Sequence, residues 1–341
     1  MEKRDIRSML PAEIEAQILE MGEPKFRAKQ IFEWLQRGAG DFAEMTNLSV
    51  TLREKLAEKF FLYAPSVLEK QASADGTIKY LWELADGNSV ETVLMRYRHG
   101  NTVCISSQVG CRMGCTFCAS AIGGLVRNLT AAEMLEQVLC TERDAGAEIS
   151  NIVLMGIGEP LDNFENVLRF LTLVNHPAGR NIGMRHITLS TCGLVEMIDK
   201  LATYNLQLTV SVSLHAADDE TRSRLMPVNR TGGVMELLEA AKRYFNSTGR
   251  RVSFEYAMIH GMNDTPEHAK TLAKRVKETG GHVNLIPLNP IAERDFGPSA
   301  KERLVLFEQI LRRAGVNVTV RRSLGGDIDA SCGQLRRRKE L

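Results

Sequence analysis

The chain has 341 residues, of which 44% are hydrophobic and 25% charged, a composition typical of a soluble globular protein and not of a disordered one. Its net charge of +1 gives no global electrostatic argument for a nucleic-acid or membrane partner. The start of the sequence lacks the apolar stretch of a signal peptide, and no run of about 18 apolar residues occurs anywhere. We therefore expect a cytoplasmic protein without membrane spans.

The first hundred residues predict two small parts before the main domain. Residues 1–60 contain apolar positions at helical spacing, which predicts a helical accessory module with a modest core of its own. Two β-type runs then flank Asp86 and Gly87, which is a hairpin pattern. We expect the helical module at 1–60, a linker with a β-hairpin extension at 61–100, and a larger domain at 101–341.

Strands and helices alternate regularly after residue 100. Strands are predicted at residues 102–106, 151–158, 185–191, 206–215, 250–259, 282–289 and 316–322. Helices between them begin at capping patterns, with Thr130 and Glu133 at one and Ser299 and Glu302 at another. This alternation predicts an α/β fold with a parallel sheet, either a partial (β/α)6-type barrel or a doubly wound open sheet.

Four of the seven cysteines fall within "CISSQVGCRMGCTFC". Cys111, Cys115 and Cys118 have the spacing C-x3-C-x2-C, and Cys104 stands seven residues before the first of them. Clustered cysteines in a reducing compartment indicate metal binding or catalysis more often than disulfides. Three thiolates without an obvious fourth would leave one iron of an iron–sulfur cluster open. A zinc site is the alternative, although it would more often pair two C-x2-C units or add histidines.

Polar residues also stand at the ends of several predicted strands. They are Glu159, preceded by Gly158, and Ser190, Ser213, His215 and Asn289. Residues at the carboxyl ends of barrel strands line the mouth of a barrel, and a carboxylate with main-chain carbonyls there can hold an ammonium group. The sequence therefore places a candidate site beside the cysteine loop.

The cysteine spacing, with Phe117 before the last thiol, resembles that of the radical S-adenosylmethionine (SAM) enzymes. "MGIGEPL" is similar to the GEP motif of that superfamily. The resemblance implies a partial barrel in which Cys111, Cys115 and Cys118 hold a 4Fe–4S cluster, whose reduction cleaves SAM to a 5′-deoxyadenosyl radical. It also implies SAM contacts at Gly158, Glu159, Ser190, Ser213, Leu214, His215 and Asn289.

A narrower resemblance covers nearly the whole chain. "CISSQVGC", "SLHA", "RLMPVN", "HVNLIPLNP" and "DIDASCGQL" are similar to segments of the RNA adenine methyltransferases RlmN and Cfr. "NPIAERDF" and "NVTVRRSLGGDIDASCGQLR" look more like RlmN, which methylates C2 of adenine, than Cfr, which methylates C8. The resemblance implies C2 methylation of adenosine in 23S rRNA and in tRNA, with C8 methylation as the alternative. An iron–sulfur RNA-binding regulator without turnover is an alternative of another class.

The same resemblance implies roles for three further residues. Cys332 would carry the methyl group as S-methylcysteine, with two SAM molecules used per turnover. Glu91 would accept the proton of the adenine ring. Cys104 would be the resolving cysteine, which forms a transient disulfide with Cys332 and so releases the product. A regulator that only binds RNA would need none of the three.

The implied partners are RNA and an electron donor of the flavodoxin or ferredoxin type, and we expect a monomer. RNA contacts are expected at the arginine-rich end from Arg312 onward and at Lys25, Arg27 and Lys29. The helical module resembles the RNA-binding accessory domain of the family.

Overall fold

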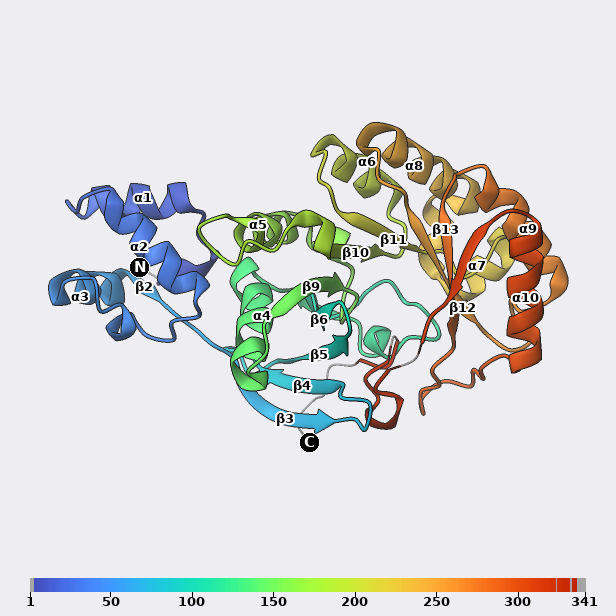
Figure 1. Ribbon diagram of the computed structural model, residues 1–341, viewed down its shortest axis with the longest axis horizontal. Coiled ribbons are helices and arrows are strands. Elements are labelled where there is room, and N and C mark those ends of the chain that lie inside the picture. The colour runs from blue at the N-terminus through green and yellow to red at the C-terminus, as the bar shows by residue number, and fades with distance from the viewer. Residues whose placement is uncertain (1–2, 323, 332, 336–341) are drawn as a thin grey trace.

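The computed structural model describes residues 3–322, 324–331 and 333–335, and a ten-stranded mixed sheet forms its centre (Figure 1). In spatial order the strands are β14 (Asn317–Val320), β13 (His282–Pro287), β12 (Ser253–Met258), β11 (Thr209–Ser213), β10 (Ile187–Thr191), β9 (Ile149–Leu154), β6 (Gly100–Cys104), β5 (Ser89–Tyr97), β4 (Ile78–Glu83) and β3 (Ser66–Ala72). The seven strands from β14 to β6 are parallel, whereas β5, β4 and β3 continue the sheet in antiparallel pairs.

This strand order settles the choice between the two predicted architectures. The parallel strands follow one another in chain order, without the reversal that defines a doubly wound sheet. In the described part of the chain β14 and β3 remain the two edges, so the sheet is open. The expected partial barrel is therefore confirmed, extended by the predicted hairpin of β4 and β5 and by β3, which was not predicted.

Helices cover the outer face of the parallel strands (Figure 1). They are α4 (Ala131–Ala145), α5 (Phe164–Asn175), α6 (Val195–Thr203), α8 (Gly233–Thr248), α9 (Pro266–Lys277) and α10 (Lys301–Arg313), with the short α7 (Asp219–Leu225) before α8. Successive side chains of a strand point to opposite faces of the sheet. Leu189 and Val210 accordingly lie in the core, while Ser190 lines a cavity on the inner face. The fold thus keeps its polar side chains on the inner face, where the site lies.

The two capping patterns had different outcomes. The Thr130 hydroxyl accepts a hydrogen bond from the Glu133 N–H at 3.2 Å, and the Glu133 carboxylate accepts one from the Thr130 N–H at 2.8 Å. The predicted cap at Ser299 is wrong, because Ala300 is the N-cap of α10 and no side chain caps it. Ser299 is held before the helix instead, where its N–H donates to the Met258 carbonyl at 3.4 Å beside a bridge between Ile259 and residue 298.

The N-terminal module contains α1 (Pro11–Glu20), α2 (Phe26–Gln36) and α3 (Val50–Lys59), with a short parallel pair of β1 (Arg4–Asp5) and β2 (Phe60–Phe61). Its apolar side chains do not form the expected core of their own, because in the described residues they belong to one cluster with those of α4 and α5. Arg7 is buried between the two parts, in contact with the Glu136 carboxylate and the Ala39 carbonyl. None of the described helices is long and apolar enough to cross a membrane.

Candidate active site

A cavity of about 160 Å³ opens where the parallel strands end. Its wall contains the three clustered cysteines, the loop after β9, and residues at the carboxyl ends of β10, β11, β12 and β13. The lining residues that matter below are Cys111, Cys115, Cys118, Gly158, Glu159, Ser190, Cys192, Ser213, His215, Glu255, Asn289, Arg321 and Gly333. The structure thus brings together, at one cavity, the clustered cysteines and residues from the ends of several strands, with lining residues up to 222 positions apart in sequence (Cys111 to Gly333).

The cysteine loop is closed at its base by a short antiparallel ribbon of β7 (Gln108–Gly110) and β8 (Leu125–Asn128). Gly110 has a φ of +76°, and a Cβ at this position would overlap the carbonyl oxygen of Gly124. The middle of the loop docks on the end of α7, where the Thr116 N–H donates to the Leu225 carbonyl at 2.9 Å. Both anchors fix the loop over the cavity.

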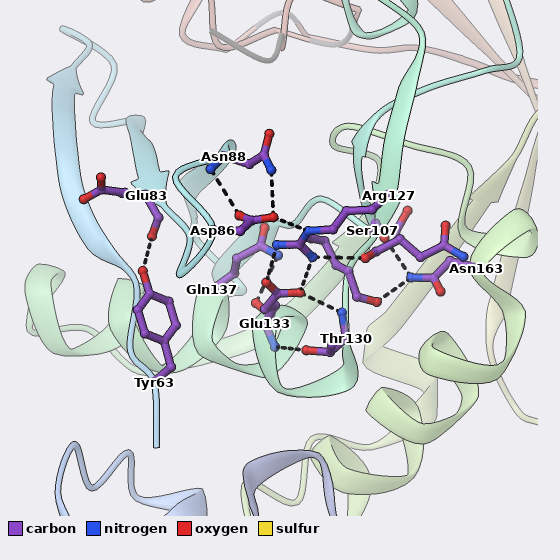
Figure 2. Close-up of polar contacts among 12 residues, drawn as sticks. Tyr63, Glu83, Asp86, Asn88, Ser107, Arg127, Thr130, Glu133, Gln137 and Asn163 are labelled. Atoms are coloured by element: carbon purple, nitrogen blue, oxygen red, sulfur yellow. Dashed lines mark hydrogen bonds and ion pairs between the residues drawn. The ribbon is translucent and has the colours of Figure 1, made fainter. Parts of the chain in front are cut away.

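A polar network ties this ribbon to the neighbouring elements (Figure 2). Arg127 of β8 donates to Asp86 in the β4–β5 turn at 2.6 Å and to Glu133 of α4 at 2.7 Å. The Arg127 guanidinium holds the pKa of Asp86 well below its usual range. Asn163 donates to the Ser107 carbonyl at 2.8 Å, just before β7. The base of the cysteine loop is therefore joined to the hairpin and to two helices.

All three cysteines of the loop line the cavity. Among the described residues, no group of three or more His, Cys, Asp or Glu side chains is placed to hold a single metal ion. Ligands of a multi-iron cluster are spread over its corners, so thiols arranged around a shared cavity fit such a cluster better than a zinc ion. Burial raises the pKa of Cys111 to about 12 and that of Cys115 well above its usual value, and cationic iron would counter this by stabilising the thiolates.

The loop after β9 presents a buried carboxylate to the same cavity. Glu159 is 3% exposed, and its two oxygens accept hydrogen bonds from the Leu161 N–H at 3.0 Å and the Cys192 N–H at 2.6 Å. Burial raises the pKa of this carboxyl group. Gly158 before it has a φ of +106°, and a Cβ there would lie 2.6 Å from the Cβ of Gln108. The backbone at Gly158 can therefore pass this close to Gln108 only because Gly158 has no side chain.

Six of the seven residues expected to contact SAM line the cavity, and Leu214 does not. The Leu214 side chain is buried in the apolar core, while its carbonyl accepts a hydrogen bond from Arg222 Nε at 3.0 Å. His215, with a φ of +54°, accepts the Ala257 N–H at its Nδ1 at 2.9 Å, so its ring is oriented by the next strand. Burial, and to a lesser extent the Arg222 charge, lowers the pKa of His215 to about 3, which leaves the ring neutral.

Two charged residues at the site were missed by the sequence analysis. Arg222 is fully buried beside the cavity, and its guanidinium donates to the Cys192 carbonyl at 2.7 Å, to the Ser213 carbonyl at 3.1 Å and to Asn229 Oδ1 at 2.8 Å. It ties the ends of β10 and β11 to the segment after α7. Three residues after Arg222, Leu225 anchors the cysteine loop.

Glu255 is the second missed residue, and it points to the inner face from the middle of β12. One oxygen accepts from Ser211 Oγ at 2.5 Å and from Asn284 Nδ2 at 3.0 Å, while the other lies 3.8 Å from Arg321 Nη1. A carboxylate inside the mostly apolar run "VSFEYAM" was the signal that could have identified it.

A second cavity, of about 30 Å³, adjoins the first and is lined by Cys104. We call the first the cysteine-loop cavity and the second the Cys104 cavity. Met155, Ile286, Asn289 and Arg321 line both cavities and so form the wall between them. The structure therefore places Cys104 next to the cysteine-loop cavity, although Cys104 does not line that cavity itself.

Residues 324–331 and 333–335, here called the C-terminal segment, supply lining residues to both cavities. Cys332 lies outside the described residues, but its neighbours are described. Ser331 lines the Cys104 cavity, and Gly333 lines the cysteine-loop cavity. The Gly333 carbonyl accepts the N–H of Ala119, the residue after Cys118, at 2.8 Å.

Glu91 is buried on β5 beneath the same segment. Lys79 Nζ lies 3.6 Å from Glu91 Oε1 and donates to the Asp329 carbonyl at 3.3 Å. Glu91 is 1% exposed and lines neither of the two cavities. The structure thus brings Glu91 next to the C-terminal segment, and not into the open site.

Comparisons with known proteins agree with this fold and site. Residues 105–275 match the family model of the radical SAM superfamily, and residues 5–62 match that of the ribosomal RNA large subunit methyltransferase N-terminal domain. A radical SAM methyltransferase from Sphaerobacter thermophilus has a similar solved structure, with a TM-score of 0.93, 46% identity, and coverage of 97% of this chain and 99% of that one.

Two curated relatives carry the name "Probable dual-specificity RNA methyltransferase RlmN". The relative from Desulforamulus reducens is 52% identical over 99% of this chain and 97% of its own length. The relative from Bacillus cytotoxicus is 51% identical over 98% of this chain and 93% of its own length. The fold and the cysteine loop define a radical SAM enzyme, whose cofactors are a 4Fe–4S cluster and SAM. Within that superfamily the chain belongs to the RlmN family.

Proposed function

We propose that this enzyme methylates C2 of adenosine in 23S rRNA and in tRNA, through an S-methylcysteine intermediate and with two SAM molecules per turnover. The observation that carries the proposal is the position of the residues on either side of Cys332. Ser331 borders the Cys104 cavity and Gly333 borders the cysteine-loop cavity. A thiol between these two neighbours is suited to take a methyl group at one cavity and to react with Cys104 at the other.

In this proposal Cys111, Cys115 and Cys118 hold the 4Fe–4S cluster. Bound there, the cluster and SAM would supply a methyl group and a 5′-deoxyadenosyl radical. Gly158 and Glu159 would hold the SAM ammonium group, with the Glu159 carboxylate fixed by two main-chain N–H groups. Ser190, Ser213, His215 and Asn289 supply further polar contacts from the ends of the strands, and Leu214 acts only through its main chain.

Adenine C2 lies between two ring nitrogens and carries no acidic proton, so it does not attack a sulfonium methyl group as an ordinary nucleophile does. A thiolate does so readily, which makes Cys332 suitable as the first methyl acceptor. The 5′-deoxyadenosyl radical would take a hydrogen atom from the S-methyl group, and the resulting methylene radical would add to C2 and join Cys332 to the RNA. Glu91 would accept the C2 proton as the adduct radical gives up one electron to the cluster. Cys104 would then attack the sulfur of Cys332, which breaks the S–CH2 bond, leaves a disulfide between the two cysteines, and releases a carbon that takes up a proton to become the methyl group.

We also propose roles for the parts of the chain, an electron donor, an oligomeric state and a cellular location. Residues 1–60 form the accessory RNA-binding module, residues 61–100 the linker and hairpin extension, and residues 101–341 the radical SAM domain with the methyl-carrying segment. A flavodoxin or ferredoxin delivers the electron, and the enzyme acts as a monomer in the cytoplasm.

Two cysteine variants test the covalent route. Cys104→Ala should accumulate a covalent protein–RNA adduct, visible as a slow band on a denaturing gel that RNase removes. Cys332→Ala should give neither adduct nor methylated RNA. Cys140→Ala is the matched control, since Cys140 is a buried thiol on α4 whose Sγ donates to Glu136, away from both cavities. Normal turnover of Cys104→Ala would contradict the resolving role, and product from Cys332→Ala would contradict the S-methylcysteine route.

A further inference from the structure

A third cavity, of about 270 Å³, opens on the inner face of the sheet at the end opposite the cysteine loop. It lies where β5 ends and where β6, β9 and β10 begin. We call it the basic cavity, and the residues used below are Tyr97, His99, Asn151, Arg185, His186 and Arg321. Neither the family resemblance nor the proposed reaction gives these residues a role, except that Arg321 lies at the site already described and in the arginine-rich end expected to contact RNA.

The basic cavity has the chemistry of a nucleotide site. Two arginines and two histidines line it, and no carboxylate does so in the described part of the chain. The rings of Tyr97 and His99 are stacked, with centroids 5.1 Å apart and an angle of 13° between their planes, and Tyr97 is 39% exposed. A planar aromatic surface beside guanidinium groups suits a base with its phosphate, as in proteins that bind single-stranded nucleic acid.

The basic cavity also shares lining residues with the Cys104 cavity. Met95, Tyr97 and Arg321 line both the basic cavity and the Cys104 cavity. Arg321 lines the cysteine-loop cavity as well. The three cavities therefore follow one another along the inner face of the sheet, with Cys104 in the middle. A nucleotide in the basic cavity would lie next to one whose base is at Cys104.

Of the cations expected from sequence to contact RNA, Arg321 belongs to the basic cavity, where it lies 3.8 Å from Glu255, and others lie near carboxylates elsewhere. Lys25 lies 3.0 Å from Glu15, Lys29 lies 3.9 Å from Glu33, and Arg312 lies 2.7 Å from Glu308. Each of these three cations therefore already has a carboxylate as its neighbour. Arg185 in contrast is exposed, and it forms no ion pair with any residue that the structure describes. Its charge is open to a phosphate from solution.

We propose that the basic cavity binds the RNA nucleotide adjacent to the target adenosine, with its phosphate at Arg185 and Arg321 and its base against the stacked rings of Tyr97 and His99. The inference rests on the proposed function only in that RNA is the substrate, and it does not depend on which ring carbon is methylated. Such a contact would pull the target base out of its stack and toward Cys104.

Binding of unmodified 23S rRNA by the full chain tests the proposal. Tyr97→Ala should weaken binding at least about fivefold, since the stacking of a base on an aromatic ring is lost. Arg185→Ala should lower the slope of log affinity against log salt by about 0.7, the value for one phosphate contact on a single strand. Tyr204→Ala and Arg303→Ala are matched controls, because both residues are exposed and neither lines any of the three cavities. Iron content and the midpoint of thermal unfolding, equal to those of the unaltered protein, show that each variant is folded.

Photocrosslinking locates the nucleotide independently of any variant. RNA with 4-thiouridine next to the target adenosine should crosslink to the peptide that contains Tyr97 and His99. Crosslinks confined to the N-terminal helices or to the segment after residue 335, together with unchanged binding by both variants, would overturn the proposal. If the unaltered protein bound no RNA at all, RNA would be wrong as the substrate, and the site would be wrong with it.

Discussion

At the scale of single residues, burial decides the charge state of the groups around the cavity. His215 is enclosed between β11 and β12, next to the buried guanidinium of Arg222, with its Nδ1 occupied by the Ala257 N–H. The ring therefore stays neutral and presents only Nε2–H to the cavity. A neutral donor at this place contacts a ligand without adding charge beside the cluster cysteines.

Replacing His215 should change how stability depends on pH. The unfolded ring titrates near its ordinary pKa of about 6.5, while the folded ring has a pKa of about 3, so acid favours the unfolded chain. This penalty grows as pH falls from about 6.5 toward 3. His215→Asn keeps a side-chain acceptor and tolerates a positive φ, but removes the titration.

We expect the free energy of unfolding of the wild type to fall by about 1.5 kcal/mol more than that of His215→Asn between pH 6.5 and pH 5. Urea unfolding of the cluster-free proteins at the two pH values measures this difference. Equal losses in the two proteins would contradict the lowered pKa.

The sequence could predict site residues that are marked by their spacing or by their position at the end of a predicted strand. The clustered cysteines were found from their spacing, and Gly158 and five polar residues were found from their places at strand ends. All of them line one cavity. Arg222 and Glu255 were missed because a charged residue is ordinarily exposed. Their burial depends on partners from other strands, such as the Cys192 carbonyl and Asn284, and no local pattern contains these contacts.

At the scale of elements, the β7–β8 ribbon determines whether the cysteine loop closes. The positive φ of Gly110 and its close approach to the Gly124 carbonyl leave no room for a side chain. Gly123 also has a positive φ, of +87°, but nothing lies within 4 Å of a Cβ built there. Alanine at Gly123 would therefore add backbone strain alone, whereas alanine at Gly110 would add both backbone strain and steric overlap.

Gly110→Ala should lose most of the iron that the unaltered protein retains after anaerobic reconstitution, because the ribbon must open to admit the methyl group. Gly123→Ala should cost only about 1–2 kcal/mol of stability, for the left-handed backbone, and should keep its iron. Iron analysis and the ultraviolet–visible spectrum measure both. Full iron content in Gly110→Ala would show that the ribbon does not shape the site.

The elements that sequence missed are those without a regular apolar pattern. β3 is an edge strand with charged and mostly exposed residues, so no alternation marks it. β7 and β8 are three and four residues long and owe their pairing to the loop that they close. The strands of the parallel sheet were predicted because each places apolar residues against the helices in a run long enough to recognise.

At the scale of the whole molecule, the accessory module and the radical SAM domain share one apolar core. Arg7 and Glu136 form a buried ion pair within this shared region, and burial lowers the pKa of the Arg7 guanidinium. A charge left without its partner at this depth is costly. The pair therefore couples the module to α4, the helix that follows the cysteine loop.

Breaking this pair should destabilise the whole chain and not the module alone. We expect Arg7→Met or Glu136→Leu to lower the free energy of unfolding by about 3–5 kcal/mol, and the double variant to recover much of the loss because no buried charge remains. Circular dichroism and tryptophan fluorescence should report one transition, since Trp34 is in the module and Trp82 is in the sheet. Two separate transitions in the unaltered protein would contradict a shared core.

The central claim is the chemistry at the adenine ring, and the identity of the methylated nucleoside tests it most directly. The enzyme would be reconstituted anaerobically and given SAM, a reductant and 23S rRNA from a strain that lacks the modification. The digested RNA would then be compared with synthetic standards by mass spectrometry. We predict 2-methyladenosine. 8-Methyladenosine would contradict C2 selectivity and favour Cfr-like chemistry, and cleavage of SAM without any methylated adenosine would contradict the substrate.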